Sequence, residues 1–349
     1  MSQLTRYILI PALVGAVVGL IIMALNGQSG HKPGFAGAVA AAAPAVVNIH
    51  STKITRSRIC NIPRYRQLCE RFAGDPQVVN SLGSGVVVRE DGYILTNHHV
   101  IENADSILVM FSNNRTLTAR VIGSDAQTDL AIIKVGATKL PVIAYDADNP
   151  VQVGDIALAI GNPFGFSHSV SQGIISAMSR SLITQDRPYD EFIQTDAAIS
   201  PGNSGGALVD HRGRLIGINT MTFTTSGGSD GIGFAIPADL ALSVMDQILT
   251  HGRVIRGWLG VNLELAPSLD DSSEHGLRVT RIERNSPAHR AGLRLGDILL
   301  AANDISANNV QIITNVIANT APGATLQLEV MRDNQLFRAE ATIVELPLL

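Results

Sequence analysis

A succession of short β-rich runs between Gly85 and Ile236 is the feature that most restricts the fold of this chain. Turn-forming residues such as Glu90-Asp91-Gly92 separate the runs. Many short strands at this spacing are typical of an antiparallel barrel or sandwich. The predicted strands are Gly85–Val88, Tyr93–Thr96, Ile107–Phe111, Leu117–Ile122, Ala131–Val135, Ile156–Ile160, Val170–Ser176, Phe192–Thr195, Ala207–Val209, Leu215–Asn219 and Gly233–Ile236.

The pattern changes on both sides of this block. Before it, Ala38–Ala45 predicts a short helical piece that leads into a strand, and Arg56–Asn80 predicts a long surface loop. After it, Ala238–Leu249 has the apolar spacing of a helix. From Trp258 onward, strand and helix signals alternate, which indicates a small α+β domain. Its predicted elements are strands at Leu277–Ile282, Asp297–Ala302, Thr325–Met331 and Phe337–Val344, and helices at Ser286–Gly292 and Asn309–Ala318.

The amino terminus carries the segment that decides the compartment. Ile8–Leu25 is an uncharged apolar run of the length that a transmembrane helix needs, at the short end of the range. A cleaved signal peptide or a buried core helix is the alternative, but a polar, glycine-rich tether (27–37) follows and favours an uncleaved anchor. Arg6 before the span favours a cytoplasmic amino terminus by a narrow margin.

Composition excludes several classes of function. The formal net charge is −4 and long Lys/Arg runs are missing, which argues against nucleic acid as the main partner. Neither His-Glu-x-x-His nor Cys-x-x-Cys occurs, so we expect no metal and no cofactor. The two cysteines, Cys60 and Cys69, form a disulfide if the chain is exported and are otherwise free thiols of a surface loop.

Three motifs point to nucleophilic catalysis. Ser204 lies between glycines in Gly202-Asn203-Ser204-Gly205-Gly206, where the backbone can approach a substrate carbonyl closely. His99 follows the strand Tyr93–Thr96, and Asp129 precedes another strand. The order His, Asp, Ser is that of chymotrypsin-like proteases and differs from the orders in subtilisins and α/β-hydrolases. Each residue alone has a purely structural interpretation, but together they favour a serine protease.

These motifs resemble the HtrA/Deg family of serine proteases. The matching segments are Gly92–Ile101, Asp125–Ala131, Gly161–Gly165, and Gln194 through Gly206, and the similarity covers nearly all of residues 38–349. The organisation most resembles the DegS type, with one membrane span and one PDZ domain. The resemblance implies an anchor at 1–26, a linker at 27–37, a chymotrypsin-like double β-barrel at 38–252 and a PDZ domain at 253–349.

The resemblance also assigns roles to residues. It selects His99 over His98 as the base and Asp129 over Asp125 as the acid, with Ser204 as the nucleophile. The oxyanion hole would use the backbone N–H groups of Gly202 and Ser204, with Asn203 as a further candidate. Trp258-Leu259-Gly260-Val261 matches the loop of a PDZ domain that binds a peptide's terminal carboxylate. Arg180 matches a sensor arginine, and Arg256 matches a residue of the protease–PDZ contact.

The same resemblance implies a biological setting. Proteins of this type are homotrimers anchored by one span in the bacterial inner membrane, with the protease in the periplasm. Their PDZ domain binds C-termini of misfolded outer-membrane proteins, and the protease then cleaves an anti-sigma factor in the envelope stress response. Two alternatives stay open: a general quality-control protease that degrades unfolded proteins, and a PDZ-based binding or chaperone module. The cysteine-containing loop is longer than the family pattern predicts.

Overall fold

The structure of the protein is a computed structural model that describes residues 15–18, 34–55, 77–163, 168–180, 192–222, 231–266 and 276–347. Residues 15–18 are helical, whereas the rest of the predicted anchor Ile8–Leu25 lies outside the described ranges. Within these ranges no helix combines the length and the apolar character that crossing a bilayer requires. The loop with Cys60 and Cys69 also lies outside them.

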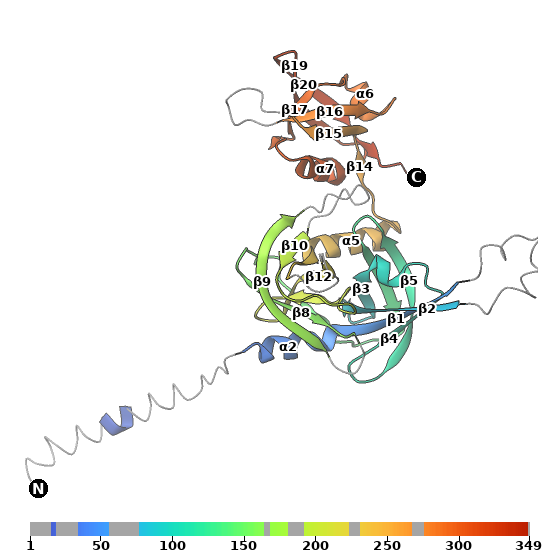
Figure 1. The fold of residues 1–349 in the computed structure, drawn as a ribbon, viewed down its shortest axis with the longest axis vertical. Coiled ribbons are helices and arrows are strands. Elements are labelled where there is room, and N and C mark those ends of the chain that lie inside the picture. The colour runs from blue at the N-terminus through green and yellow to red at the C-terminus, as the bar shows by residue number, and fades with distance from the viewer. Residues whose placement is uncertain are drawn as a thin grey trace, which may run out of the picture. The chain divides into compact units, whose positions relative to one another are not determined.

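The first barrel is a closed ring of six strands that follows a short helical piece, as the sequence predicts (Figure 1). Helix α2 (Ala36–Ala42) and one 3-10 turn (Ala43–Ala45) lead directly into β1. The strands pair in the order β1-β2-β3-β6-β5-β4, and all pairings are antiparallel. They are β1 (Val46–Thr55), β2 (Gln77–Val87), β3 (Tyr93–Asn97), β4 (Ser106–Met110), β5 (Thr116–Asp125) and β6 (Leu130–Val135).

The second sheet has seven strands in the order β11-β8-β9-β10-β13-β12-β7. Strand β11 also pairs with β12, and this additional pairing closes a second ring. The ring encloses a core of small and branched side chains, among them Ile175, Ile193 and Leu208. Its strands are β7 (Ala144–Tyr145), β8 (Ile156–Gly161), β9 (Ser169–Arg180), β10 (Phe192–Thr195), β11 (Ala207–Val209), β12 (Arg214–Thr222) and β13 (Gly233–Pro237).

Helix α5 (Ala238–His251) joins the two barrels, since it contacts β12 and β13 as well as β5 and β6. Its Ile248 fills the space beside Gly123, where a Cβ atom would lie 2.5 Å from a methyl of Ile248. Gly252 then ends the helix in the left-handed conformation, with φ +77°. The predicted helix is therefore confirmed, and it extends two residues beyond the predicted end.

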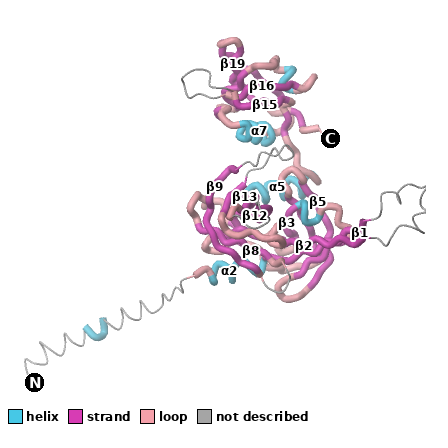
Figure 2. Tube along the Cα trace, viewed as in Figure 1, coloured by secondary structure: helices cyan, strands magenta, loops and turns pink. Residues whose placement is uncertain are grey.

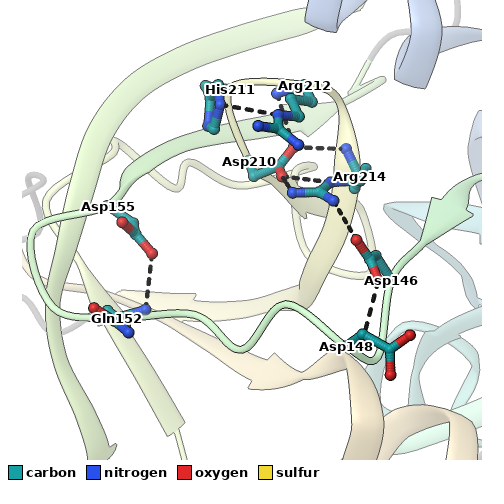
Figure 3. Close-up of polar contacts among 8 residues, drawn as sticks. All are labelled: Asp146, Asp148, Gln152, Asp155, Asp210, His211, Arg212 and Arg214. Carbon is teal, nitrogen blue, oxygen red and sulfur yellow. Dashed lines mark hydrogen bonds and ion pairs between the residues drawn. The ribbon is translucent and has the colours of Figure 1, made fainter.

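A polar network at the β11–β12 turn holds one end of the second barrel together (Figure 3). Asp210 accepts hydrogen bonds from the backbone of Arg212 (2.8 Å) and from the side chain of Arg214 (2.8 Å). Arg214 also forms an ion pair with Asp146, which follows β7. Burial alone would raise the pKa of Asp210, but these donors outweigh it and hold the pKa below its usual value. The network fixes the start of β12, the strand that continues to Thr220.

The carboxy-terminal part is the α+β unit that the sequence predicts (Figure 2). Its core combines helix and sheet residues such as Ile313 and Leu328 with Leu259 of the loop between β14 and β15. Five strands pair in the order β15-β16-β17-β19-β20 with β18 beside β17, and β14 pairs separately with β21. The elements are β14 (Gly257–Trp258), β15 (Val261–Leu265), β16 (Leu277–Ile282), α6 (Pro287–Arg290), β17 (Ile298–Ala302), β18 (Ile305–Ser306), α7 (Val310–Asn319), β19 (Thr325–Arg332), β20 (Gln335–Thr342) and β21 (Val344–Glu345).

One predicted loop is partly wrong. The segment expected to be loop up to Asn80 is already strand from Gln77, because Gln77–Leu82 pairs with β1. The mainly β double-barrel architecture with a following α+β domain is confirmed.

Candidate active site

His99 lies at the start of a one-turn helix, α4 (His98–Ile101), that follows β3 without a loop. Its ring Nδ1 lies 2.7 Å from Oδ2 of Asp129, and its backbone N–H donates to Oδ1 of the same carboxylate at 3.0 Å. The His99 side chain is 42% exposed, whereas that of Asp129 is 1% exposed. The imidazole is therefore anchored on its buried edge and accessible on the other.

Asp129 has an unusual backbone conformation that the surrounding segment stabilises. Its φ is +55°, in the left-handed region that Asp and Asn tolerate better than most residues. Its carbonyl accepts hydrogen bonds from the backbone N–H of His98 (2.9 Å) and from Nδ2 of Asn97 (3.0 Å). These bonds fix the carboxylate beneath the imidazole at the junction of β5 and β6.

The pKa of Asp129 is lowered despite its burial. Burial by itself raises the pKa, but hydrogen bonds from His99 and Thr220 and the attraction of the imidazole outweigh it. The Thr220 hydroxyl donates to Oδ2 of Asp129 at 2.9 Å. The carboxylate is therefore ionised at neutral pH, and it accepts rather than donates the bond to His99.

Ser204 lies in the turn before β11, and its hydroxyl donates to the carbonyl of Thr220 at 2.9 Å. Thr220 thus contacts both Asp129, through its side chain, and Ser204, through its backbone. Among the residues that the structure describes, no hydrogen bond joins Ser204 Oγ to the ring of His99. The structure brings the three predicted residues to one place, with the serine hydroxyl turned towards Thr220.

The turn before Ser204 is shaped by proline and glycine. The N–H of Asn203 donates to the carbonyl of Ser200 at 2.9 Å, and Gly202 between them has φ +94°. Proline followed by a residue with positive φ is the pattern of a type II turn. The Asn203 amide is therefore already bonded, whereas the amides of Gly202 and Ser204 have no acceptor in the described part of the chain. Of the three candidates for an oxyanion hole, the geometry favours Gly202 and Ser204.

The predicted carboxylate-binding loop lies between β14 and β15 and lines a groove beside α7. Gly260 has φ +80°, and a Cβ atom there would lie 2.3 Å from that of Ser286, so another residue would be strained and crowded. The lining residues are Gly257, Trp258, Leu259, Gly260, Val261, Leu263, Val310, Thr314 and Ile317.

The comparisons with known proteins agree with this geometry. The family model described as a trypsin-like peptidase domain matches residues 83–218, and that of the PDZ domain matches 257–343. The serine endoprotease DegS of Haemophilus influenzae is 39% identical over 315 residues, which is 90% of this chain and 88% of that protein. The chain belongs to the HtrA family of serine endoproteases.

Other relatives lie in the same family. A probable periplasmic DegP-like serine endoprotease of Pseudomonas savastanoi pv. phaseolicola is 40% identical over 363 residues, covering 96% of this chain and 75% of that protein. The solved structure of the HtrA-type protease AlgW with a tripeptide has a TM-score of 0.78 and 42% identity, covering 91% of this chain and 99% of that chain. This HtrA protein is therefore a serine endoprotease with a trypsin-like peptidase domain and a PDZ domain.

In this HtrA chain, Arg256 forms a buried ion pair with Asp125 at the end of β5. The guanidinium donates to Oδ1 at 2.9 Å and to Oδ2 at 2.6 Å, and both side chains are about nine-tenths buried. Oδ2 of Asp125 also accepts bonds from the N–H (3.1 Å) and the hydroxyl (2.5 Å) of Thr128. Thr128 directly precedes Asp129 in the chain. The ion pair is therefore connected, through Thr128 alone, to the residue whose carboxylate lies beneath His99.

The remaining predicted residues are less completely placed. Arg180 is the last residue of β9 and pairs with Phe192 of β10, while its side chain lies outside the described atoms. Within the described ranges no group of His, Cys, Asp and Glu side chains could hold a metal ion. Sequence reasoning missed Thr220. Its only sequence signal is a hydroxyl residue in β12, the second strand after the Ser204 turn.

Proposed function

We propose that Ser204 is the nucleophile of this protease, with His99 as general base and Asp129 as the orienting acid. The observation that carries the assignment is the double hydrogen bond between His99 and the buried, ionised Asp129. Because the carboxylate accepts a hydrogen bond from Nδ1–H, the neutral imidazole has its lone pair at Nε2, which is the base that takes the Ser204 proton. The same nitrogen then donates this proton to the leaving amine.

The oxyanion hole in this proposal consists of the amides of Gly202 and Ser204. Gly202 lies two residues before the proposed nucleophile, and the other amide is that of the nucleophile itself. Neither amide has an acceptor among the described residues, so both are available to a developing oxyanion. Loss of one such donor typically costs about 3 kcal/mol in the activation barrier. Asn203 is left out because its N–H bonds to Ser200.

In this proposal, the described arrangement is the resting state of the enzyme. Ser204 Oγ donates to Thr220 instead of His99, so the hydroxyl has to turn before the base can take its proton. A rotation of one side-chain torsion between staggered positions is a small step compared with rebuilding a strand. Such a site is suited to control by a bound ligand.

The ligand in our proposal is the C-terminus of a misfolded outer-membrane protein bound to the PDZ domain. Backbone N–H groups of Leu259, Gly260 and Val261 would hold its carboxylate, and the peptide would add as a strand beside β15. The solved relative AlgW is named with a tripeptide and with a decapeptide, which supports peptide binding in this family. A domain that only packs beside the protease would not need this groove.

Two arginines relay the signal in this proposal. Arg256 contacts Asp125, which holds Thr128 next to Asp129, so a change at Arg256 reaches the catalytic carboxylate through consecutive contacts. Arg180 ends β9 at the edge of the segment 181–191 and acts as the sensor of an occupied PDZ domain. These roles follow the family resemblance together with the Asp125–Arg256 contact.

The substrate in this proposal is an anti-sigma factor, and the enzyme is a homotrimer anchored by Ile8–Leu25 with its protease in the periplasm. The DegS relative and the relatives named periplasmic support this setting. Broad degradation of unfolded proteins is the second candidate function, favoured by the 40% identity to a DegP-like protease. The assignment of 38–252 as protease and 253–349 as PDZ domain, and a disulfide between Cys60 and Cys69, belong to the same proposal.

Two experiments test these assignments. A fluorophosphonate should label Ser204, and peptide mapping should show no label after Ser204→Ala. Failure to label the wild-type chain even with a C-terminal peptide present would refute the catalytic assignment. Cleavage of casein and of an anti-sigma factor, each with and without C-terminal peptides, separates the two functions. Peptide-stimulated cleavage of the anti-sigma factor alone supports the sensor, and degradation of both supports quality control.

A further inference from the structure

Ser84 is a fully buried residue of β2 that contacts the nucleophile turn from the other barrel. Its backbone N–H donates to the carbonyl of Ser204 at 2.8 Å, and its hydroxyl donates to the carbonyl of Gly202 at 2.7 Å. The hydroxyl also accepts from the N–H of Asn162 at 2.8 Å. One side chain thus ties the first barrel to two loops of the second.

The Ser84 hydroxyl fixes one end of a peptide group whose other end is fixed as well. The carbonyl of Gly202 bonds to Ser84, and the N–H of Asn203 in the same peptide group bonds to Ser200. Because a peptide group is planar, two bonds at opposite ends determine its orientation. The next carbonyl, that of Asn203, accepts from the N–H of Gly206 at 2.9 Å, so the N–H of Ser204 faces the opposite way.

Ser84 holds a second peptide group through its backbone. The carbonyl of Ser204 accepts from Ser84, and the N–H of Gly205 in that group donates to Asn219 at 2.8 Å. The backbones also approach closely, since a Cβ atom on Gly205 would lie 2.2 Å from the carbonyl oxygen of Ser84. Three consecutive peptide groups around the nucleophile are therefore held, and Ser84 holds two of them.

We propose that the Ser84 hydroxyl is a positioning residue for the oxyanion hole. This inference rests on the proposed hole formed by the amides of Gly202 and Ser204. The Gly202–Asn203 peptide group lies between the two amides of the hole, and the hydroxyl fixes this group by anchoring the carbonyl of Gly202. Without the hydroxyl, the buried carbonyl of Gly202 loses its hydrogen-bond donor, which costs free energy. We therefore expect the turn to rearrange so that this carbonyl finds another donor.

Ser84→Ala in the full chain tests the role, because it removes the hydroxyl and leaves the backbone bond to Ser204. With a peptide substrate and activating C-terminal peptide, we expect kcat per folded molecule to fall by about ten- to a hundredfold at unchanged KM. Affinity for a peptidyl boronic acid, which mimics the tetrahedral state, should fall by the same factor. The pH midpoint of kcat should stay in place, because the bonds between His99 and Asp129 are untouched.

Thr195→Val is the matched control. Thr195 is fully buried in β10, and its hydroxyl donates to the carbonyl of Ile174 (2.7 Å) and accepts from the N–H of Ala197 (3.1 Å). It repeats the bonding pattern of Ser84 without contacting the nucleophile turn. We expect a comparable loss of thermal stability and wild-type kcat per folded molecule, with folded protein counted by far-ultraviolet circular dichroism.

Further variants keep the test decisive. Ser84→Thr and Ser84→Val have the same shape and differ in the hydroxyl, so their kcat ratio reports the hydroxyl even if alanine weakens the barrel. A Ser84→Ala enzyme whose kcat and boronate affinity equal those of Thr195→Val, or a Thr/Val ratio of one, overturns the inference. If the wild-type chain fails to react with fluorophosphonate at Ser204, the proposed function fails instead, so the two failures are distinguishable.

Discussion

The hydroxyl of Thr220 donates to the carboxylate of Asp129 at 2.9 Å, while the carbonyl of Thr220 accepts from the Ser204 hydroxyl at the same distance. One buried residue of β12 therefore contacts both ends of the proposed triad. The side chain stabilises the ionised carboxylate of Asp129, and the backbone carbonyl accepts from the hydroxyl of the proposed nucleophile. Removing the hydroxyl should affect the first contact and leave the second in place.

Thr220→Val is accordingly expected to lower kcat/KM by about tenfold, because the carboxylate loses one of its donors and orients the imidazole less firmly. The measurement is peptide hydrolysis in the presence of an activating C-terminal peptide, with Thr195→Val as the isosteric control. Fluorophosphonate labelling should persist at a reduced rate. A rate equal to that of the control would show that the bond to Asp129 is unimportant for catalysis.

Ser204→Ala should abolish proteolysis, with a loss on the order of a millionfold in kcat if the triad acts as a unit. The fold should be retained, since the exchange removes one hydrogen bond from a half-buried turn residue. Binding of a C-terminal peptide to the PDZ domain should be unchanged, and isothermal titration calorimetry checks this. Residual cleavage near the wild-type rate would place the nucleophile elsewhere.

The Asp125–Arg256 ion pair predicts a pH-dependent stability. Burial alone would raise the pKa of Asp125, but Arg256 and Thr128 outweigh it and keep the pKa below its usual value. A carboxyl group with a lowered folded-state pKa stabilises the fold above its unfolded pKa of about 3.9 and loses this contribution as the pH falls through the folded-state value. Asp125→Asn should therefore lower the free energy of unfolding by about 3 kcal/mol at neutral pH.

Urea unfolding of Asp125→Asn and the wild type from pH 7 downward checks this prediction. The difference between the two should narrow as the pH falls below the unfolded pKa of about 3.9. Arg338→Ala is the control, because its ion pair with Glu329 is exposed, with 79% of the arginine side chain accessible, and should contribute little. A difference that is independent of pH would mean that the charge of Asp125 is not the source of the stability.

Arg180→Ala and Arg256→Ala should affect activation in opposite directions. Loss of the proposed sensor Arg180 should weaken peptide-stimulated cleavage while fluorophosphonate still labels Ser204. Loss of Arg256 removes a contact present in the resting arrangement, so cleavage without peptide should rise. Cleavage rates across a titration of C-terminal peptide separate the two effects, with Arg338→Ala again as control. Wild-type stimulation in Arg180→Ala would exclude the sensor role.

Gly260→Ala should abolish peptide binding by the PDZ domain. The new methyl group would lie 2.3 Å from Cβ of Ser286 and would force a left-handed residue into strain, so the loop has to move. Trp258 lines the groove and is the chain's single tryptophan, so its fluorescence reports binding without a label. Gly292→Ala is the matched control, because Gly292 has the same φ of +80° but no atom near its Cβ position. Equal affinity in both variants would mean that the loop does not bind the carboxylate.

Much of this architecture could be predicted from local sequence. Strand β11 and strand β10 occur at the predicted residues, because short apolar runs between turn residues have few alternative structures. The first half of β2 was missed, since Val78-Val79-Asn80-Ser81 lacks an alternating pattern and becomes a strand through its pairing with β1. The two-residue strand β7 likewise exists through its parallel pairing with β12.

The residues of the site also fall into two groups, those that a sequence motif marks and those that none marks. Ser204, His99 and Asp129 have motifs of their own, and the structure brings these motifs together. Thr220 and Ser84 have none, because their roles depend on partners 91 and 118 residues away in the chain. A serine or threonine in a strand takes such a role only where folding brings the two barrels into contact. The resting orientation of Ser204 likewise depends on a carbonyl that no sequence motif marks.

The division of the site between two barrels has a consequence for biosynthesis. His99 and Asp129 emerge early from the ribosome, whereas Ser204 in the turn before β11 and Thr220 in β12 belong to the later, second barrel. A partly synthesised chain thus has the proposed base and the proposed acid but lacks the proposed nucleophile. Since domains fold from the amino terminus as they appear, proteolytic competence arises only after the last barrel strand has arrived.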